Sequence, residues 1–565
     1  MFIRVKNKPT KANVFNKTVQ LVESVRQQGK VKQKIIKHLG VAYDQKQLDD
    51  LKSLAQILKE KLEDSSQFAL FGADELPALE PLSAEHETTS PVLERDDDFN
   101  VDLRALEEQG RIVNGIHDVY GQLFDEINLS SLFKSPQRNK SAVNIFKQIV
   151  MARIANPDSK RASVKGLEEQ FGVSLNLDQV YRMMDKIDDK AIDNLNEIAY
   201  RETKRLFNDK IDVIFFDATT LYFESFSEDE FKKNGYSKDL KFNQPQVVLA
   251  LMVTKEGLPI GYQAFSGDTF DGHTLMPALE QLKSQYNLDQ VVYVADSGMF
   301  NEANLSQLEE RDFDYIVGAR IKNLPNALKE KILDSSHYEP LNSSVKVARF
   351  KHKNRILVVS YSEKRAKKDR FEREKGIAKL KKQVEKHQSP KDYLSNQGYK
   401  KFLQLDKQCD AKVTLNEEKI NEASRWDGLK GLIVSQSCQL SNEEILAQYN
   451  NLWQVEQSFR ITKHDLKIRP IYHWKPRRVK AHLAISFAAY MLSRYLEHRI
   501  KTQYKKLSPA VIRSLLLSVQ TSVLDHPQKK IKYGLPSSHK PDVVKIYQLM
   551  GVKMKRSAYI IEKYE

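Results

Sequence analysis

The chain is short of cysteine and has no long apolar run. Its two cysteines among 565 residues, Cys409 and Cys438, exclude a disulfide framework and a four-cysteine zinc site. No apolar stretch reaches the roughly 18 residues that a membrane-spanning helix needs, and the N-terminal sequence MFIRVKNKPTK has no apolar signal-peptide core. The sequence therefore predicts a cytoplasmic protein without a membrane partner.

Acidic residues are in deficit. The chain has 75 Asp and Glu against 90 Lys and Arg, which gives a formal net charge of +15 at pH 7. A large protein this basic commonly binds a polyanion, and nucleic acid is the first candidate. A generally basic protein without such a partner is the alternative that composition leaves open.

Composition and periodicity divide the chain into six parts. The first alternates apolar with polar or basic residues over three short strands and continues into an amphipathic helix, and it serves either as a DNA-contacting module or as a structural cap. The second is acidic and contains proline, as flexible linkers do. The predicted parts are a basic β-meander with a helix (1–63), an acidic flexible linker (64–100), a helical DNA-binding region (101–208), a mixed-sheet core (209–321 and 429–500), a subdomain inserted into this core (322–428) and a C-terminal helical segment (501–565).

The helical region contains a segment with the layout of a helix-turn-helix, Ser163 to Ile187. One short helix ends at Gly172, and after a turn a second helix begins near Leu177. Arg161, Lys165 and Arg182 are candidate phosphate contacts in this interpretation. Ordinary packing of two helices explains the same pattern and stays open.

Two aspartates directly follow predicted buried strands. Asp217 follows the run 212–216, and Asp296 follows the run 290–295. The elements from 212 onward read as three strands, a helix, a strand, a helix and a strand, an order that fits a mixed sheet whose first and fourth strands are adjacent. A carboxylate at the end of a buried strand is costly unless it is paired or binds a metal. The order therefore predicts that the two aspartates lie side by side.

The sequence from Glu443 to Lys467 predicts one long helix. Ser441 is a good N-cap and Glu444 completes a capping box. Tyr449, Glu456 and Lys463 are seven residues apart, close to two turns, so they share one helix face. The alternative for this helix by itself is a core-facing helix whose charged ends reach water.

These three motifs together resemble the insertion-sequence DDE transposases of the IS-four superfamily. The sequence FFDATTLYF around Asp217 matches the strand of the first catalytic Asp, and VYVADSGMFN around Asp296 matches that of the second. The spacing of Tyr449, Glu456 and Lys463 is similar to the family's Y-x-x-R-x-x-x-E-x6-K signature.

One position departs from that signature. Its Arg is Leu452 in this chain, and Arg460, one turn after Glu456 on the same face, is the candidate for a replacement cation. The resemblance implies that Tyr449 and Lys463 hold phosphates of the transposon end. With Arg460, they are the expected DNA-binding residues.

The resemblance implies a ribonuclease H-like catalytic core in a multidomain α/β (α+β) protein, with Asp217, Asp296 and Glu456 as catalytic triad and metal ligands. Cleaving and joining phosphodiesters suits two divalent ions about 4 Å apart. Hard cations prefer oxygen ligands, hence carboxylates. Mg²⁺ is the expected ion, with Mn²⁺ as a substitute; Asp217 would bridge the two ions.

The predicted function is that of a transposase that cleaves the ends of an insertion sequence and joins them to target DNA in cut-and-paste transposition. Its expected partners are the terminal inverted repeats and target DNA, with a homodimer in the active complex and a bacterial, nucleoid-associated location. Two alternatives remain: a structure-selective nuclease on the same fold, and a DNA-binding regulator without catalysis.

Overall fold

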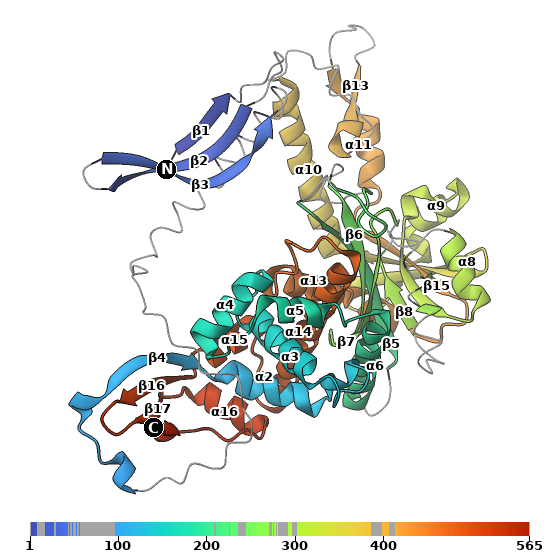
Figure 1. The fold of residues 1–565 in the computed structure, drawn as a ribbon. Helices are drawn as coiled ribbons and strands as arrows, with labels where there is room; N and C mark the ends of the chain where they lie inside the picture. Colours follow the sequence, from blue (N-terminus) through green and yellow to red (C-terminus); the bar gives the residue numbers. More distant parts are fainter. Residues whose placement is uncertain are drawn as a thin grey trace. The chain divides into compact units, whose positions relative to one another are not determined.

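The computed structural model shows two compact units, Met1–Ala78 and Leu79–Glu565 (Figure 1). Each unit is described by itself. The residues described are 2–7, 17–27, 30–42, 45, 48, 52, 56, 96–207, 211–224, 227–235, 244–269, 274, 276–277, 279–280, 292–296, 302–385, 398–405 and 413–563.

The first unit contains the expected three-stranded antiparallel meander. Its strands are β1 (Phe2–Asn7), β2 (Lys17–Gln27) and β3 (Lys30–Ala42), and they pair in this order. Val19 and Val22 of β2 are fully buried. The four described residues of the helix predicted at 45–62 are helical. Of the predicted linker at 64–100, residues 64–95 lie outside the described part, and Asp96–Phe99 form a 3₁₀ turn.

The second unit is built around a nine-stranded mixed sheet in the order β10-β11-β12-β15-β9-β8-β5-β6-β7. Central strands such as β6 are buried on both faces, which explains their nearly continuous apolar sequence. The strands are β5 (Val213–Tyr222), β6 (Gln246–Thr254), β7 (Pro259–Ser266), β8 (Val292–Ala295), β9 (Asp314–Ala319), β10 (Glu339–Pro340), β11 (Val345–His352), β12 (Arg355–Ser362) and β15 (Leu429–Ser435).

Five of these strands confirm the predicted topology. β5, β6 and β7 are antiparallel neighbours, and β5 then pairs in parallel with β8, which pairs in parallel with β9. The first and fourth strands are therefore adjacent, which is the ribonuclease H-like arrangement. The crossover from β8 to β9 runs through α8 (Glu302–Glu310).

Helices cover both faces of this sheet (Figure 1). Alternate residues of β5 enter two different hydrophobic cores: Val213, Phe215 and Leu221 face the core shared with α13 and α14, while Ile214 and Phe216 face the core shared with α8. The helices on the larger core are α2 (Gly115–Glu126), α3 (Lys140–Ala155), α4 (Lys160–Phe171), α5 (Leu177–Met184), α6 (Asp189–Leu206), α12 (Asn442–Asn450), α13 (Trp453–Arg460), α14 (Pro476–Gln503), α15 (Pro509–Leu517) and α16 (Pro541–Leu549).

The helix pair predicted at 163–187 is present as α4 and α5. α4 ends on Gly172, whose φ of 65° is a left-handed C-cap, and α5 begins after the capping box of Asn176 and Gln179. Arg161, Lys165 and Arg182 are exposed. Their contact with DNA stays a prediction.

The segment predicted as an inserted subdomain divides in two. β11 and β12 extend the central sheet because β12 pairs with β15, which pairs with β9. The following part adds α10 (Glu363–Glu385), the two-stranded pair β13 (Leu403–Leu405) and β14 (Val413–Leu415), and α11 (Glu417–Ser424); α9 (Asn326–Leu333) precedes the strands. The strand predictions at 345–352 and 355–362 are confirmed, but these strands belong to the core sheet.

The prediction of a helical C-terminal segment is wrong. Besides α15 and α16 it forms β16 (Gln520–His526), β17 (Ile531–Pro536) and β18 (Tyr559–Lys563), which join β4 (Glu107–Val113) in the sheet β18-β17-β16-β4. The prediction that 101–208 is helical throughout fails for the same reason. Pairing of β4 with a strand more than 400 residues later decides the conformation of both.

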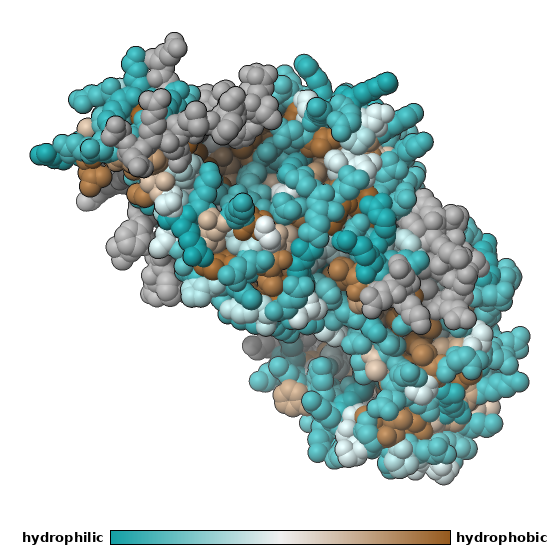
Figure 2. Space-filling model, turned by 90° about the horizontal axis from the view of Figure 1, so that it is seen from below, coloured by the Kyte–Doolittle hydropathy of each residue, from teal (hydrophilic) through white to brown (hydrophobic). Residues whose placement is uncertain are grey.

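No described helix is long and apolar enough to cross a membrane. On the face drawn in Figure 2, hydrophilic residues predominate and hydrophobic ones lie in separate patches.

Candidate active site

Asp217 lies within β5, not at its end as the sequence predicted. Pairing with β6 continues through Tyr222 opposite Gln246, so the strand runs five residues beyond the aspartate. Asp217 is half-buried, and its Oδ1 accepts a hydrogen bond from the N–H of Ala218 at 2.8 Å. β6 therefore holds the strand at Asp217 through its pairing with Leu251, two residues beyond the last pair between β5 and β8.

Asp296 directly follows β8, as predicted, and is exposed. The parallel register pairs Val213 with Val292 and Phe215 with Val294, a constant offset of 79 residues. Continued for two residues beyond the last pair, the same offset sets Asp217 level with Asp296, on neighbouring strands about 4.8 Å apart. Both aspartates continue the alternation that faces the larger core. The register thus assigns both aspartates to one sheet face on neighbouring strands.

The predicted long helix is interrupted once, at Asn451 and Leu452, and its second part ends in a π-helix. α12 has the expected capping box of Ser441 and Glu444, but it ends at Asn450; α13 follows, and residues Ile461–Asp465 form a π-helix. The break occurs at Leu452, which is buried. It lets α12 pack on β8 and β9 while α13 packs on β5 and β6.

Tyr449 contacts a catalytic candidate directly. Its hydroxyl donates a hydrogen bond to Oδ1 of Asp296 at 3.2 Å. Burial raises the pKa of Tyr449, and the negative charges of Asp296 and Glu456 raise that pKa further. The hydroxyl therefore stays protonated and acts as a donor to Asp296.

Glu456 is exposed on α13, between the buried residues Val455 and Phe459. These two apolar side chains fix the rotation of α13 over the sheet face that carries the aspartates. The charge of Glu456 acts on Tyr449, which also bonds Asp296. Glu456 and Asp296 therefore both act on Tyr449.

Lys463 reaches back to the strand of Asp217. Its Nζ donates to Oγ1 of Thr219 at 2.5 Å, and Thr219 lies two residues after Asp217, on the same face of β5. The π-helix that carries Lys463 ends the helical segment of Glu456. Arg460 is exposed at the end of α13.

No group of three or more His, Cys, Asp or Glu side chains within the described part of the chain is close enough to hold a metal ion. Three carboxylates drawn together repel each other unless a cation lies between them. Asp217, Asp296 and Glu456 fit a hard divalent ion in donor chemistry, because all three offer carboxylate oxygens.

Sequence reasoning missed two cations beside Asp296. Nζ of Lys430, on β15, lies 4.3 Å from the ring centroid of Tyr449 and donates to Oδ1 of Asn450 at 3.3 Å. Burial and the positive charge of Arg365 lower the pKa of Lys430, and the charge of Asp296 opposes this. A lysine inside the apolar run of a strand, LKGLIVS, was the available signal.

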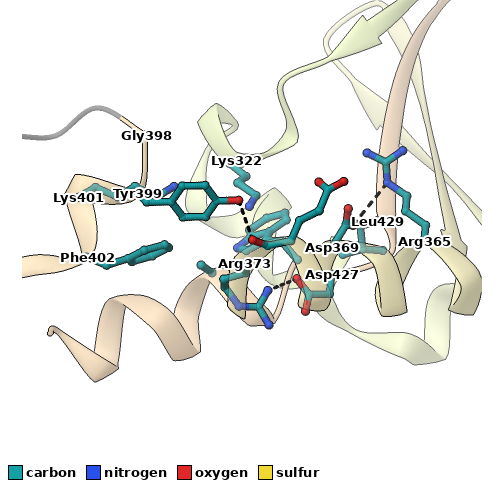
Figure 3. Close-up of a pocket in the computed structure, with 13 residues that line it drawn as sticks. Lys322, Arg365, Asp369, Arg373, Gly398, Tyr399, Lys401, Phe402, Asp427 and Leu429 are labelled. Carbon is teal, nitrogen blue, oxygen red and sulfur yellow. Dashed lines mark hydrogen bonds and ion pairs between the residues drawn. The ribbon is translucent and has the colours of Figure 1, made fainter. Parts of the chain in front are cut away.

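Arg365, on α10, also lines a cavity of about 400 Å³ near this site (Figure 3). Arg373 pairs with Asp427 there, and Nε of Arg365 lies 3.6 Å from Oδ2 of Asp369. The cavity's basic and acidic side chains are nearly balanced, so it has little excess charge for binding an anion.

Comparison with solved structures found transposases of low similarity. The chain is 12% identical to the piggyBac transposase in a synaptic complex with hairpin DNA, covering 71% of this chain and 76% of that one, with a TM-score of 0.36. It is 12% identical to the Mos1 transposase in a paired-end complex with the left transposon end (28% and 54% covered, TM-score 0.14), and 14% identical to the Mos1 mariner paired-end complex with Mn (32% and 58%, TM-score 0.13). TM-scores this low carry no detail of the site. No match was found among curated proteins.

Family models match both units. The model of the transposase DDE domain matches residues 208–492, half of the chain, and includes all three carboxylates. The model of the N-terminal domain of IS1634 family transposases matches residues 3–69. DDE transposases cleave DNA and carry out strand transfer, and their chemistry depends on divalent metal ions. Two family matches in sequence order, over a ribonuclease H-like sheet with Asp217 and Asp296 level on adjacent strands, show that this chain belongs to the insertion-sequence DDE transposases.

Proposed function

We propose that this transposase moves its element by a cut-and-paste route, with Asp217, Asp296 and Glu456 as the catalytic carboxylates. The observation that carries the proposal is the register of β5 and β8, which sets the two aspartates level on the face covered by α13. Glu456 extends from α13 over that face. The test is cleavage and joining of DNA that carries the element's terminal inverted repeats.

These carboxylates would hold two Mg²⁺ ions, or Mn²⁺ in their place. When bound, such ions supply a reactive water and stabilise the leaving oxygen of a phosphodiester. The chain's own residues position the ligands: β5 fixes Asp217, Tyr449 orients Asp296 through its hydroxyl, and Val455 and Phe459 fix the direction of Glu456. After cleavage, the freed 3′-hydroxyl is positioned for attack on target DNA.

Lys463 and Arg460 are proposed phosphate contacts. Lys463 donates to Thr219, two residues from Asp217, so it is placed to contact a phosphate next to the scissile one. Lys430 lies over the ring of Tyr449, and its charge interacts with Asp296 and Arg365, so these two cations are further candidates for phosphate contact. The main role proposed for Tyr449 is to orient Asp296, and contact with DNA is its secondary role.

The N-terminal unit is proposed to bind the transposon ends. Residues 1–42 contain ten Lys or Arg and one Glu, so they contribute +9 (10 − 1) of the chain's net +15. Such a concentration of charge favours phosphate contacts. We also propose a homodimer in the active complex, since cut-and-paste needs both ends of the element held together.

A chain of residues 79–565 is expected to fold and to bind transposon-end DNA more weakly. The two units are compact by themselves, and the deletion removes the densest basic segment. We expect an affinity loss of about tenfold or more, with a shallower dependence of binding on salt. Gel-shift titrations at several salt concentrations measure this, with circular dichroism as folding control. Unchanged affinity and slope would rule out the N-terminal unit as the DNA-binding part.

Replacing Tyr449 with Phe is expected to raise the Mg²⁺ concentration needed for half-maximal cleavage by roughly 10–100-fold, because the ligand Asp296 loses its orienting hydrogen bond. End binding should change little. Titrating Mg²⁺ at saturating DNA measures the effect. Weaker DNA binding with an unchanged Mg²⁺ requirement would instead make Tyr449 a phosphate contact.

A structure-selective nuclease on the same fold is the second candidate. It would cut DNA without joining it, so a strand-transfer assay with a pre-cleaved end separates the two. Metal-dependent nicking of any kind excludes a regulator without catalysis.

A further inference from the structure

A cluster of buried basic side chains lies between α3, α4 and the segment that follows the π-helix. Arg153, in the last turn of α3, is 2% exposed, and Lys160, at the start of α4, is 4% exposed. Together with His473 and His482 they line a cavity of about 300 Å³. This cavity lies outside the carboxylate site, and the reaction proposed above does not use it.

Arg153 is only partly satisfied. Its Nη1 donates to the carbonyl oxygens of Leu466 and Lys467 at 3.3 and 3.2 Å. Its Nε has no hydrogen-bond partner among the residues that the structure describes. A buried guanidinium N–H without a partner is costly, and an acceptor in the cavity would remove this cost.

Lys160 has a neutral hydrogen-bond acceptor beside its ammonium group. Its Nζ lies 3.4 Å from Nδ1 of His482. Nε2 of His482 lies 3.0 Å from the carbonyl oxygen of Ile468, so Nε2 carries the ring proton and Nδ1 accepts from Lys160. An imidazole nitrogen offers no negative charge to a buried ammonium group.

Electrostatics also indicate that this cavity suits an anion. Burial, and to a smaller extent the positive charge of Arg153, lowers the pKa of Lys160 well below its usual value. Burial and the nearby cations lower the pKa of His473 to about 3. The acidic residue in the lining, Asp158, is exposed and accepts from the N–H of Ser159 at 2.6 Å. The cavity thus combines two buried basic groups with one exposed carboxylate.

We propose that this cavity binds a phosphate group of the DNA backbone, an inference that rests on the proposed function. The 12-residue helix α4 begins at the cavity, and its first N–H groups favour an anion there. The orphaned Nε of Arg153 and the Nζ of Lys160 supply charged donors. A bound phosphate favours the protonated form of Lys160, so the protein takes up protons when it binds DNA.

The surface at the cavity fits DNA better than a small anion alone. Arg161 and Tyr472 line the cavity and are exposed, Tyr472 by 61%. Trp474, two residues further, is 73% exposed and precedes Lys475. Cations beside exposed aromatic rings are suited to a nucleic-acid backbone and its bases.

Occupation of this cavity would also steady the catalytic segment. Arg153 bonds the carbonyls of Leu466 and Lys467, directly after the π-helix that carries Lys463. A phosphate on Arg153 therefore connects the helical region with the end of the segment that bears Glu456.

The test compares the full-length protein with its Lys160→Met variant, which keeps the buried chain length and removes the charge. Lys147→Met, on α3 but paired with Asp125 away from the cavity, is the control. Inorganic phosphate against chloride at equal ionic strength should raise the melting temperature of the wild type and the control, but not of Lys160→Met. End-DNA binding by Lys160→Met should be about tenfold weaker, with a salt slope shallower by about one. In a series of end duplexes, each with one phosphate replaced by a neutral methylphosphonate, one duplex should bind the wild type more weakly than the unmodified duplex does. The same replacement should not change the affinity of Lys160→Met.

Each outcome decides the proposal. Equal DNA affinity and equal salt slope for the wild type and Lys160→Met would overturn the proposal. This holds even if inorganic phosphate stabilises the wild type, because the cavity would then bind free phosphate and not DNA. If Lys160→Met fails to fold, the methylphosphonate series is measured with the wild type at several pH values. The wild type must then take up fewer protons when it binds the sensitive duplex than when it binds the unmodified duplex. Failure of the wild type to bind end DNA at all would instead contradict the proposed function.

Discussion

Asp217→Asn, Asp296→Asn and Glu456→Gln are each expected to reduce DNA cleavage by roughly 10³-fold or more and to leave end binding nearly unchanged. An amide keeps the shape of the side chain but offers a metal ion only one neutral oxygen donor. The DNA contacts proposed here lie on other residues. Cleavage of labelled end DNA at saturating Mg²⁺, together with gel-shift affinities, measures both effects.

Stability without metal gives a second readout for these variants. Each substitution removes one of the three carboxylate charges proposed to hold the metal, so the melting temperature in EDTA should not fall and should no longer rise on adding Mg²⁺. Glu443→Gln, exposed on α12, is the matched control and should behave as wild type. Cleavage near the wild-type rate by any one of the three would remove that residue from the triad.

Lys463→Met is expected to lower end binding and cleavage by about 10–100-fold, the effect of losing a charged hydrogen-bond partner worth roughly 1.5–3 kcal/mol. The salt slope of binding should become shallower by about one, since one phosphate contact is lost. Gel-shift titrations across a salt series measure the slope.

Thr219→Val separates this role from a structural one. It removes the oxygen that Lys463 bonds in the DNA-free protein and keeps the lysine. If Lys463 serves DNA, Thr219→Val retains the wild-type salt slope. If the lysine only anchors the π-helix to β5, the two variants lose stability alike and neither changes the slope, which would contradict the prediction.

The core topology could be predicted from the sequence because its signals are local and strong. The runs before Asp217 and Asp296 are apolar and of strand length, and the order of elements leaves one sheet arrangement that places them together. The length of β5 was underestimated, because Thr219 and Thr220 are buried by pairing with β6 and the sequence does not reveal that partner.

The break in the catalytic helix had no comparable signal. Residues 443–467 contain no Pro or Gly, and their helical periodicity is good. A two-residue turn at Asn451 and Leu452 separates α12, which contacts β8 and β9, from α13, which contacts β5 and β6; these are tertiary contacts that the local sequence does not show. Lys430 and Arg365 were missed for a related reason: the residues they interact with lie on other elements of the fold.

The pairing of β4 with β16 has a consequence for the timing of activity. β4 is made early, but its partner at 520–526 leaves the ribosome only after all three carboxylates have been synthesised. α2 packs against α15, so the helical region waits for the same late segment. A nascent chain therefore carries the complete set of acidic residues before it has a finished fold to support them. Synthesis interrupted between residues 456 and 520 would yield a polypeptide that contains all three carboxylates but lacks the strand that completes the fold, and it would be inactive.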